Sequence, residues 1–313
     1  MLDLAKFSPA RVCFGGASLS GSGGGYGFGE ISKQKAHHLL NYSYERGIKV
    51  FDTAPIYGFG QSEKTLGEVF KKVRESVFYI SKSGVDWHST KRVNMSNCPK
   101  VTERMLHQSL KDLKSDYIDL YMIHHPDKKI DIRKPMEVLA KAKQMGKISS
   151  IGLCNTSLED YQKCLEIEKI EALQMEHNFY KRDSFESFKH LIEKDHLTFF
   201  CWGGLDKGIL SGDVYPDRVY DPCDARSWAP WWKKENKEKK YLTVKKLKSV
   251  LEGAGYSLID LSLHFLMKTD KYLYPLFGMK SSEHVDKIFD CLDHNIDKEV
   301  LESCEKIYRE LWH

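Results

Sequence analysis

The chain has 313 residues, of which 41% are hydrophobic and 29% are charged, and its 48 basic and 44 acidic side chains leave a formal charge of +4. This balance is typical of a folded globular protein and excludes a disordered chain. So small a net charge gives no electrostatic reason to expect a nucleic-acid partner. The sequence contains no apolar run that would form a transmembrane helix, and its first residues lack the pattern of a secretory signal. We therefore expect a cytoplasmic protein with no membrane partner.

The eight cysteines are scattered and include no C-x-x-C pair. We expect reduced thiols that fill space in the interior, and neither a disulfide framework nor a zinc site. Clustered carboxylates and His-x-His pairs are absent from the predicted strand ends, so no metal is expected.

Short β-rich runs alternate with amphipathic stretches along most of the chain. Helices are predicted over residues 32–46, 63–72, 102–113 and 135–145, and Gly47 and Gly146 mark the ends of the first and last of these. The predicted strands cover residues 12–14, 50–52, 77–82, 117–124, 148–154, 172–175, 197–201 and 272–277.

Strands that alternate with helices form right-handed crossovers and a parallel sheet. Eight such strands in a chain of this length favour an α/β fold of the (β/α)8 TIM-barrel type with long active-site loops. An open dinucleotide-binding sheet would need G-x-G-x-x-G after its first strand, and residues 15–29, GGASLSGSGGGYGFG, are too long and loose for it. We interpret this segment as a mobile loop, with a phosphate cradle as the alternative. One barrel domain is expected over residues 1–313, with a terminal helix from residue 297 to 313.

Residues 212–248 interrupt the repeat of strands and helices. The lysine run in this segment predicts a solvated helix face. Long loops in barrels tend to be active-site lids, so Trp228, Trp231 and Trp232 are predicted to cover part of a binding mouth.

Polar side chains follow three successive predicted strands. Asp52 ends the second strand, Lys82 the third and His124 the fourth, and Tyr57 lies in the loop after the second. Because all strands of a parallel barrel open on the same mouth, we expect these four side chains to converge. A lysine ammonium is expected to lower the pKa of the tyrosine, which then exchanges a proton, while the aspartate holds the lysine and a neutral histidine orients the reacting oxygen. Each residue taken alone has an alternative interpretation as an ion pair or a satisfied buried polar group.

Several segments resemble one family. Residues 47–70, GIKVFDTAPIYGFGQSEKTLGEVF, resemble the aldo-keto reductase signature F-D-T-A-x-x-Y-G followed by S-E-x-x-L-G. Residues 115–127, SDYIDLYMIHHPD, are similar to the family pattern D-Y-I-D-L-Y-x-x-H-x-P, and further blocks up to residue 285 match in family order. Trp202 and the short C-terminal end are more similar to the bacterial and potassium-channel β-subunit branch than to mammalian aldose reductases.

The resemblance implies a catalytic tetrad of Asp52, Tyr57, Lys82 and His124, with His124 chosen over its neighbour His125. It also implies NADPH as the cofactor, with NADH as the alternative. The residues assigned to this cofactor are Asn155 and Gln174 for the carboxamide, Trp202 for stacking on the nicotinamide, Leu205, Lys207 and Leu210 in the loop over the pyrophosphate, and Gly278, Lys280, Ser281 and His284 near a phosphate.

The chain departs from the family pattern at several places. Many NADPH-using relatives have Arg or Gln where His284 stands, and Glu-Asn near Lys287-Ile288. Cys154 stands where relatives commonly have serine, which weakens a hydrogen bond, and Gly203-Gly204 replaces Ser-Pro, which loosens a loop. The resemblance implies an NAD(P)H-dependent oxidoreductase that reduces an aldehyde or ketone, sugars included, with Tyr57 as the general acid. The alternative is a dinucleotide-binding regulatory subunit that senses redox state and turns over slowly. The expected partner is a small carbonyl compound.

Overall fold

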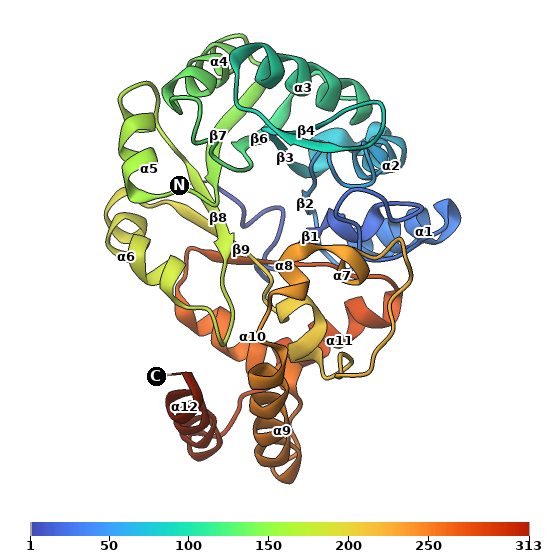
Figure 1. Ribbon diagram of the computed structural model, residues 1–313, viewed down its shortest axis with the longest axis vertical. Helices are drawn as coiled ribbons and strands as arrows, with labels where there is room; N and C mark the ends of the chain where they lie inside the picture. Colours follow the sequence, from blue (N-terminus) through green and yellow to red (C-terminus); the bar gives the residue numbers. More distant parts are fainter. Residues whose placement is uncertain (1, 313) are drawn as a thin grey trace.

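The computed structural model describes residues 2–312 and shows a barrel of parallel strands surrounded by helices (Figure 1). The barrel closes in the order β1-β10-β9-β8-β7-β6-β3-β2, so the predicted (β/α)8 TIM barrel is confirmed. Its strands are β1 (Cys13–Gly15), β2 (Val50–Asp52), β3 (Phe78–Ser83), β6 (Ile118–Ile123), β7 (Ile148–Cys154), β8 (Ala172–Glu176), β9 (Thr198–Trp202) and β10 (Leu273–Phe277). Every predicted strand coincides with one of these to within one residue at each end.

The outer layer consists of helices whose ends carry the expected signals. The helices that alternate with the strands are α1 (Lys33–Glu45), α2 (Gln61–Phe70), α3 (Pro99–Asp112), α4 (Arg133–Gln144), α5 (Leu158–Leu165), α6 (Asp183–Asp195), α10 (Leu258–Thr269) and α11 (Ser282–Leu292). The Ser32 side chain caps α1 by accepting from the backbone N–H of Lys35. Gly47 and Gly146 have φ angles of 94° and 68°, the left-handed conformation that ends a helix.

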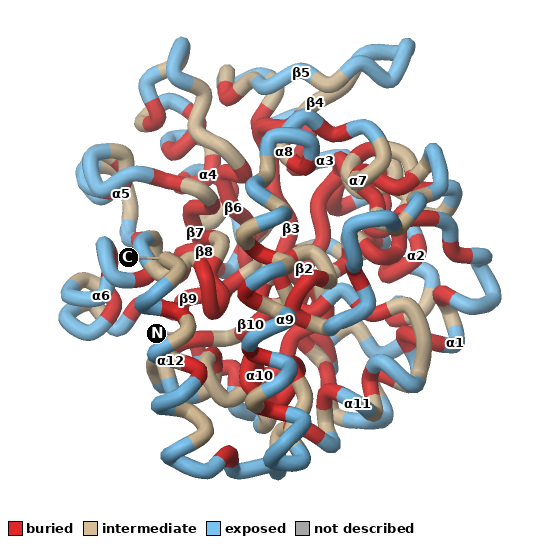
Figure 2. Tube along the Cα trace, turned by 60° about the horizontal axis from the view of Figure 1, so that its bottom comes forward, coloured by how far each residue is buried: buried red, intermediate tan, exposed pale blue. Residues whose placement is uncertain are grey.

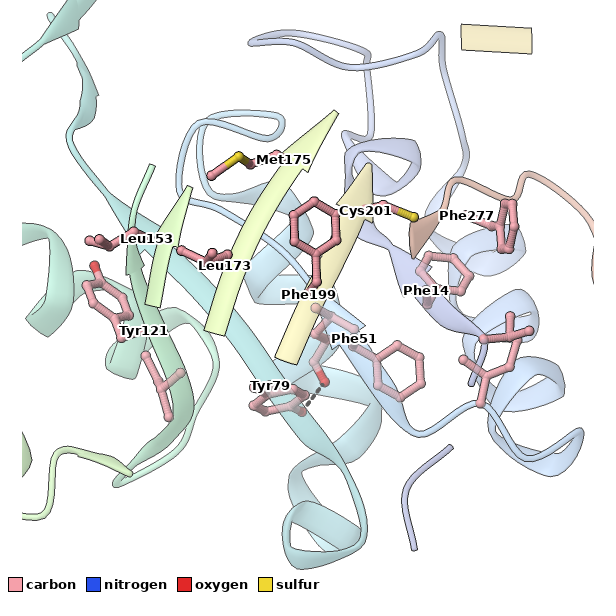
Figure 3. Packing of buried hydrophobic residues seen from close by; sticks show 14 of the residues in the cluster. Phe14, Phe51, Tyr79, Tyr121, Leu153, Leu173, Met175, Phe199, Cys201 and Phe277 are labelled. Carbon is pink, nitrogen blue, oxygen red and sulfur yellow. Dashed lines mark hydrogen bonds between the residues drawn. The ribbon is translucent and has the colours of Figure 1, made fainter. Parts of the chain in front are cut away.

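Alternate side chains of each strand face opposite sides of the barrel wall. Those that face outward, such as Phe51, Tyr79 and Phe199, pack against the helices in the largest hydrophobic cluster (Figure 3). Those that face inward form a second cluster, to which Leu2 and Leu4 of the N-terminal segment belong. The backbone N–H of Leu2 donates to the hydroxyl of Thr198, the first residue of β9, at 3.4 Å. The N-terminal segment therefore closes the amino end of the barrel, while burial decreases toward the outer helices (Figure 2).

Two long loops meet near the carboxyl ends of the strands. The loop after β1 starts with a short 3₁₀ helix, Gly16–Leu19, and its Phe28 forms an isolated antiparallel bridge with Asp224. The backbone N–H of Ala225 also donates to the carbonyl of Gly27 at 2.9 Å. A Cβ on Gly25, whose φ is 53°, would lie 2.2 Å from the carbonyl oxygen of Ile56. The glycines of this loop therefore permit close packing of backbone on backbone.

The segment after β3 contains a small hairpin outside the predicted strands. Its strands, β4 (Val85–Trp87) and β5 (Val93–Met95), pair antiparallel outside the barrel. The indole of Trp87 packs edge-on against Phe59, which lies in the loop after β2, with ring centroids 5.4 Å apart. The hairpin is too short and too exposed for periodicity to reveal it.

The segment 212–253 forms the short helices α7 (Ala225–Trp228) and α8 (Pro230–Lys233) and the longer α9 (Lys237–Gly253). The terminal helix α12 (Lys298–Trp312) lies beside α9, and the indole N–H of Trp312 donates to the Thr243 hydroxyl at 3.0 Å (Figure 1). The predicted terminal helix is thus present, while its last predicted residue, His313, lies outside the described residues. No helix within residues 2–312 is both long and apolar enough to cross a membrane.

The prediction of a fully solvated lysine run is wrong at one position. Lys240 on α9 is buried, and its ammonium contacts Asp206 at 2.8 Å and Glu235 at 2.7 Å. A buried ammonium is tolerated where carboxylates balance its charge. Lys240 therefore attaches α9 to the loop after β9.

Candidate active site

The alternation of side chains along each strand determines which of them face inward at the carboxyl end of the barrel. Asp52 on β2, Lys82 on β3 and His124 directly after β6 each lie two residues beyond a side chain of the inward-facing cluster. Gln174 on β8 and Trp202 on β9 likewise lie two residues beyond a side chain of that cluster. Because residues two apart face the same side of a strand, these polar groups converge inside the barrel mouth.

Asp52 and Lys82 form a buried ion pair. The Lys82 ammonium lies 2.6 Å from Oδ1 of Asp52 and donates to the carbonyl of Thr53 at 2.9 Å. The side chains are 0% and 5% exposed, and the Gln174 amide donates to the same Oδ1 at 2.7 Å. Burial raises the pKa of Asp52, and the charge of Lys82 opposes that shift. The pair is thus held by the adjacent strands β2 and β3 and, from farther around the barrel, by Gln174 of β8.

Tyr57 lies beside this pair in the loop after β2. Its ring centroid is 5.3 Å from the Lys82 ammonium, and the ring stands edge-on to His124 with centroids 6.0 Å apart. The expectation that Lys82 lowers the pKa of Tyr57 is wrong. Burial raises the pKa of this phenol well above its ordinary value, and the negative charge of Asp52 adds to the shift. The charge of Lys82, which is paired with Asp52, does not offset these two effects, so Tyr57 keeps its proton at neutral pH.

His124 is neutral, as expected. Burial lowers its pKa well below the ordinary value, and the nearby Lys82 ammonium adds to the shift. The ring of the next residue, His125, stacks on it with centroids 4.9 Å apart and an angle of 19° between the planes. The mouth therefore presents two parallel imidazoles.

Asn155 follows β7 in the left-handed conformation, with a φ of 52°. Its Nδ2 donates to the carbonyl of His124 at 3.1 Å, and its Oδ1 accepts from the indole N–H of Trp202 at 3.2 Å. The structure therefore brings Asn155 and Trp202 together at the mouth. Gln174 lies deeper, only 2% exposed, and its amide is committed to Asp52.

Cys154 retains a contact at the position where relatives have serine. Its Sγ lies 3.5 Å from Oε1 of Gln174, within the range of a weak thiol hydrogen bond. Burial raises the pKa of this thiol to about 12. The thiol is thus a neutral donor, weaker than a hydroxyl.

The loop after β9 holds the residues predicted to lie over a pyrophosphate. Its 3₁₀ segment, Asp206–Ser211, has left-handed φ angles at Lys207 and Gly208. Leu205 is half-buried, whereas the Leu210 side chain is buried in a separate hydrophobic cluster with α9 and α12. Leu210 can therefore face a ligand only through its backbone.

Lys207 is balanced by carboxylates that the sequence analysis did not single out. Its ammonium lies 2.7 Å from Glu176 and 3.6 Å from Glu235, between the rings of Trp202 and Trp231 at 6.0 and 5.7 Å. The charge of Lys207 is therefore already paired. These partners come from the end of β8 and from the α8–α9 connection, and no sequence spacing relates them.

The residues after β10 connect to the loop after β1. The Lys280 ammonium donates to the carbonyls of Gly29 and Glu30 at 2.7 and 3.2 Å. Burial lowers its pKa to about 8. His284 accepts from the backbone N–H of Lys280 at 3.3 Å, and Ser281 and Gly278 lie close by in the chain. Lys280 thus joins two loops as well as carrying charge.

A group of possible metal ligands lies away from the mouth, on α10, on α11 and just after α11. Ligand atoms of Asp260, Cys291 and His294 are all within 4.8 Å of one another. The Asp260 carboxylate accepts from the backbone and hydroxyl of Ser257 in a capping box, and from His294 at 2.7 Å. This arrangement is accounted for by a helix cap.

Four polar side chains are thus grouped at the mouth of a parallel (β/α)8 barrel. The chain belongs to the Aldo/keto reductase family, whose family description matches residues 11–309. It is 27% identical over 289 residues to the aldo-keto reductase Yakc [NADP(+)] of Schizosaccharomyces pombe, covering 89% of this chain and 85% of the relative. It is 26% identical over 285 residues to the NADH-specific methylglyoxal reductase of Escherichia coli, covering 86% of each.

A solved structure shares the fold. The glycerol dehydrogenase of Gluconobacter oxydans superposes with a TM-score of 0.82 at 24% identity, covering 96% of this chain and 92% of that one. At this identity the comparison establishes the fold alone.

Proposed function

We propose that this protein reduces a small aldehyde or ketone with a nicotinamide cofactor and prefers NADPH. The observation that carries the proposal is the grouping of a protonated Tyr57, a buried Asp52–Lys82 pair and a neutral His124 beside Trp202. Family membership supports the reaction class.

The residues around Trp202 fit a nicotinamide. The indole is half-buried, and its orientation is held by the hydrogen bond to Asn155, so one aromatic face is available for stacking. The Asn155 side chain is a primary amide, which pairs well with a carboxamide. When bound, the nicotinamide supplies the hydride, and the protein supplies position and protons.

Reduction of a carbonyl adds a hydride to carbon and a proton to oxygen. The high pKa of Tyr57 keeps a proton on its hydroxyl, which is the state a general acid needs. The neutral imidazole of His124 donates a hydrogen bond that orients the carbonyl oxygen. Lys82, held by Asp52, stabilises the phenolate that remains after the proton leaves.

The proposed preference for NADPH is supported by Lys280, a partly exposed cation after β10, where barrels bind phosphate. The relative from Schizosaccharomyces pombe carries NADP(+) in its name, whereas the relative from Escherichia coli is NADH-specific. NADH is therefore the alternative cofactor.

The test is steady-state oxidation of NADPH and NADH with a panel of aldehydes, ketones and sugars. We expect turnover with wild type, and a fall in kcat of about 10²–10⁴-fold in Tyr57→Phe, because only the proton donor is removed. Quenching of tryptophan fluorescence should give that variant an unchanged Kd for NADPH. Tight cofactor binding without turnover of any carbonyl would instead favour a regulatory subunit, and absence of binding would refute both functions.

A further inference from the structure

The side-chain amide of Asn155 lies in an asymmetric set of partners. Its oxygen accepts from the Trp202 indole N–H at 3.2 Å. Its nitrogen donates to the carbonyl of His124 and faces Cys154 Sγ, both at 3.1 Å, and Nε2 of His125 lies 3.3 Å away. Oxygen and nitrogen of this amide are therefore not interchangeable, because one side offers a donor and the other side offers acceptors.

His125 is an acceptor in this set only while its Nε2 carries no proton. The ring is held in place by its stack on His124. The charged and titratable groups around it are Lys82 with its partner Asp52, then His124 and, edge-on behind it, Tyr57. Burial, followed by the Lys82 charge, lowers the pKa of His125, so the ring is neutral at neutral pH and carries a single proton. With that proton on Nδ1, Nε2 accepts from the Asn155 amide nitrogen 3.3 Å away.

A proton on Nε2 of His125 would reverse its role. Two N–H donors would then face each other across 3.3 Å, and the contact would become repulsive. Turning the Asn155 amide over would relieve that contact, but it would place an N–H donor against the indole N–H of Trp202. Either outcome disturbs the contact that orients Trp202.

We propose that His125 is a positioning residue whose unprotonated Nε2 orients the Asn155 amide and, through it, the Trp202 indole that receives the nicotinamide. This inference rests on the proposed function, because the cofactor is the group whose position is at stake. It assigns to the second histidine of the His-His pair a role distinct from that of His124.

Two substitutions of His125 test its hydrogen-bond acceptor and its ring stacking separately. His125→Phe keeps a flat ring to stack on His124 and removes the acceptor, whereas His125→Gln places an amide oxygen near the former Nε2. One neutral hydrogen bond corresponds to roughly a three- to tenfold change in affinity. We expect His125→Phe to raise the Kd for NADPH by about that factor and His125→Gln to restore it to within roughly twofold of wild type. The exposed histidine of α3 provides a control, His107→Phe, which should bind as wild type does.

Two further measurements test whether the change in NADPH affinity arises from the orientation of the Trp202 indole. Binding of 2′,5′-ADP, which lacks the nicotinamide, should be the same in all variants. In wild type without cofactor, the NMR resonance of the Trp202 indole proton should shift as the pH falls below the ordinary histidine range. It should not shift in His125→Gln, and Trp202→Phe assigns the signal.

The outcomes are distinct. Equal NADPH affinity in wild type and His125→Phe, or an equal loss in His125→Phe and His125→Gln, would overturn the positioning role. An indole resonance that titrates identically in wild type and His125→Gln would also overturn it, with no cofactor involved. Failure of wild type to bind both NADPH and 2′,5′-ADP would refute the proposed function on separate grounds.

Discussion

Removing the buried cation of the site should cost stability as well as activity. In Lys82→Met, the Asp52 carboxylate would keep the bond from Gln174 but lose its counter-ion, and the Thr53 carbonyl would lose a donor. Because the lysine and aspartate side chains are 0% and 5% exposed, water does not replace the missing partner. Breaking a buried pair in this way lowers the free energy of unfolding by about 3–5 kcal/mol.

The same reasoning makes the loss depend on pH. Without Lys82, burial raises the pKa of Asp52 further, so the folded variant binds a proton under conditions in which the unfolded chain does not. Stability then falls as pH rises, because the folded state binds more protons than the unfolded state. We therefore expect the difference between wild type and Lys82→Met to be larger at pH 8 than at pH 5.

Urea unfolding followed by circular dichroism measures these differences, with the double variant Asp52→Asn/Lys82→Met as the control. Neutralising both members removes the unpaired charge, so the double variant should be about 2 kcal/mol more stable than Lys82→Met at pH 8. It should nevertheless remain inactive, since the lysine is still missing. A double variant no more stable than Lys82→Met, or a loss that does not vary with pH, would refute this account of the pair.

Two other substitutions test charged groups elsewhere in the barrel. Lys280→Met should raise the Kd for NADPH about tenfold and leave NADH unchanged, as measured by fluorescence titration, because a charge-assisted hydrogen bond to the 2′-phosphate is lost. Equal weakening of both cofactors would instead mean that Lys280 acts only by holding Gly29 and Glu30. His177 is buried against Phe185 and Phe265, and burial lowers its pKa to about 4, below the value of 6.5 for an exposed histidine. Between pH 7 and pH 5 the unfolded chain binds a proton at His177 that the folded chain does not bind. The unfolding free energy of wild type, measured by urea unfolding, should therefore fall by about 2 kcal/mol more over this range than that of His177→Phe. An equal change in unfolding free energy for the two proteins would contradict this.

Local sequence determined the barrel and the positions of the polar residues at the ends of its strands. The strands are short apolar runs between turn residues, and their alternation places Asp52, Lys82 and His124 on the inner side of three strands. Once the strands close into a barrel, residues at equal height must converge, whatever their distance along the chain. The positions of these residues at strand ends that open on one mouth were enough to predict that they converge, and the period of two explains why they face inward.

Tertiary structure alone decided which charges are paired and which protons are held. Lys207 faces Glu176, Lys240 faces Asp206, and Lys280 binds the backbone of Gly29, all across separations that no local pattern encodes. The direction of the Tyr57 pKa shift depends on burial and on the charge of Asp52, and a sequence gives the identities of these groups but not their depths or distances. Electrostatic energies vary with distance and with the surrounding dielectric, so these properties exist only once the chain has folded.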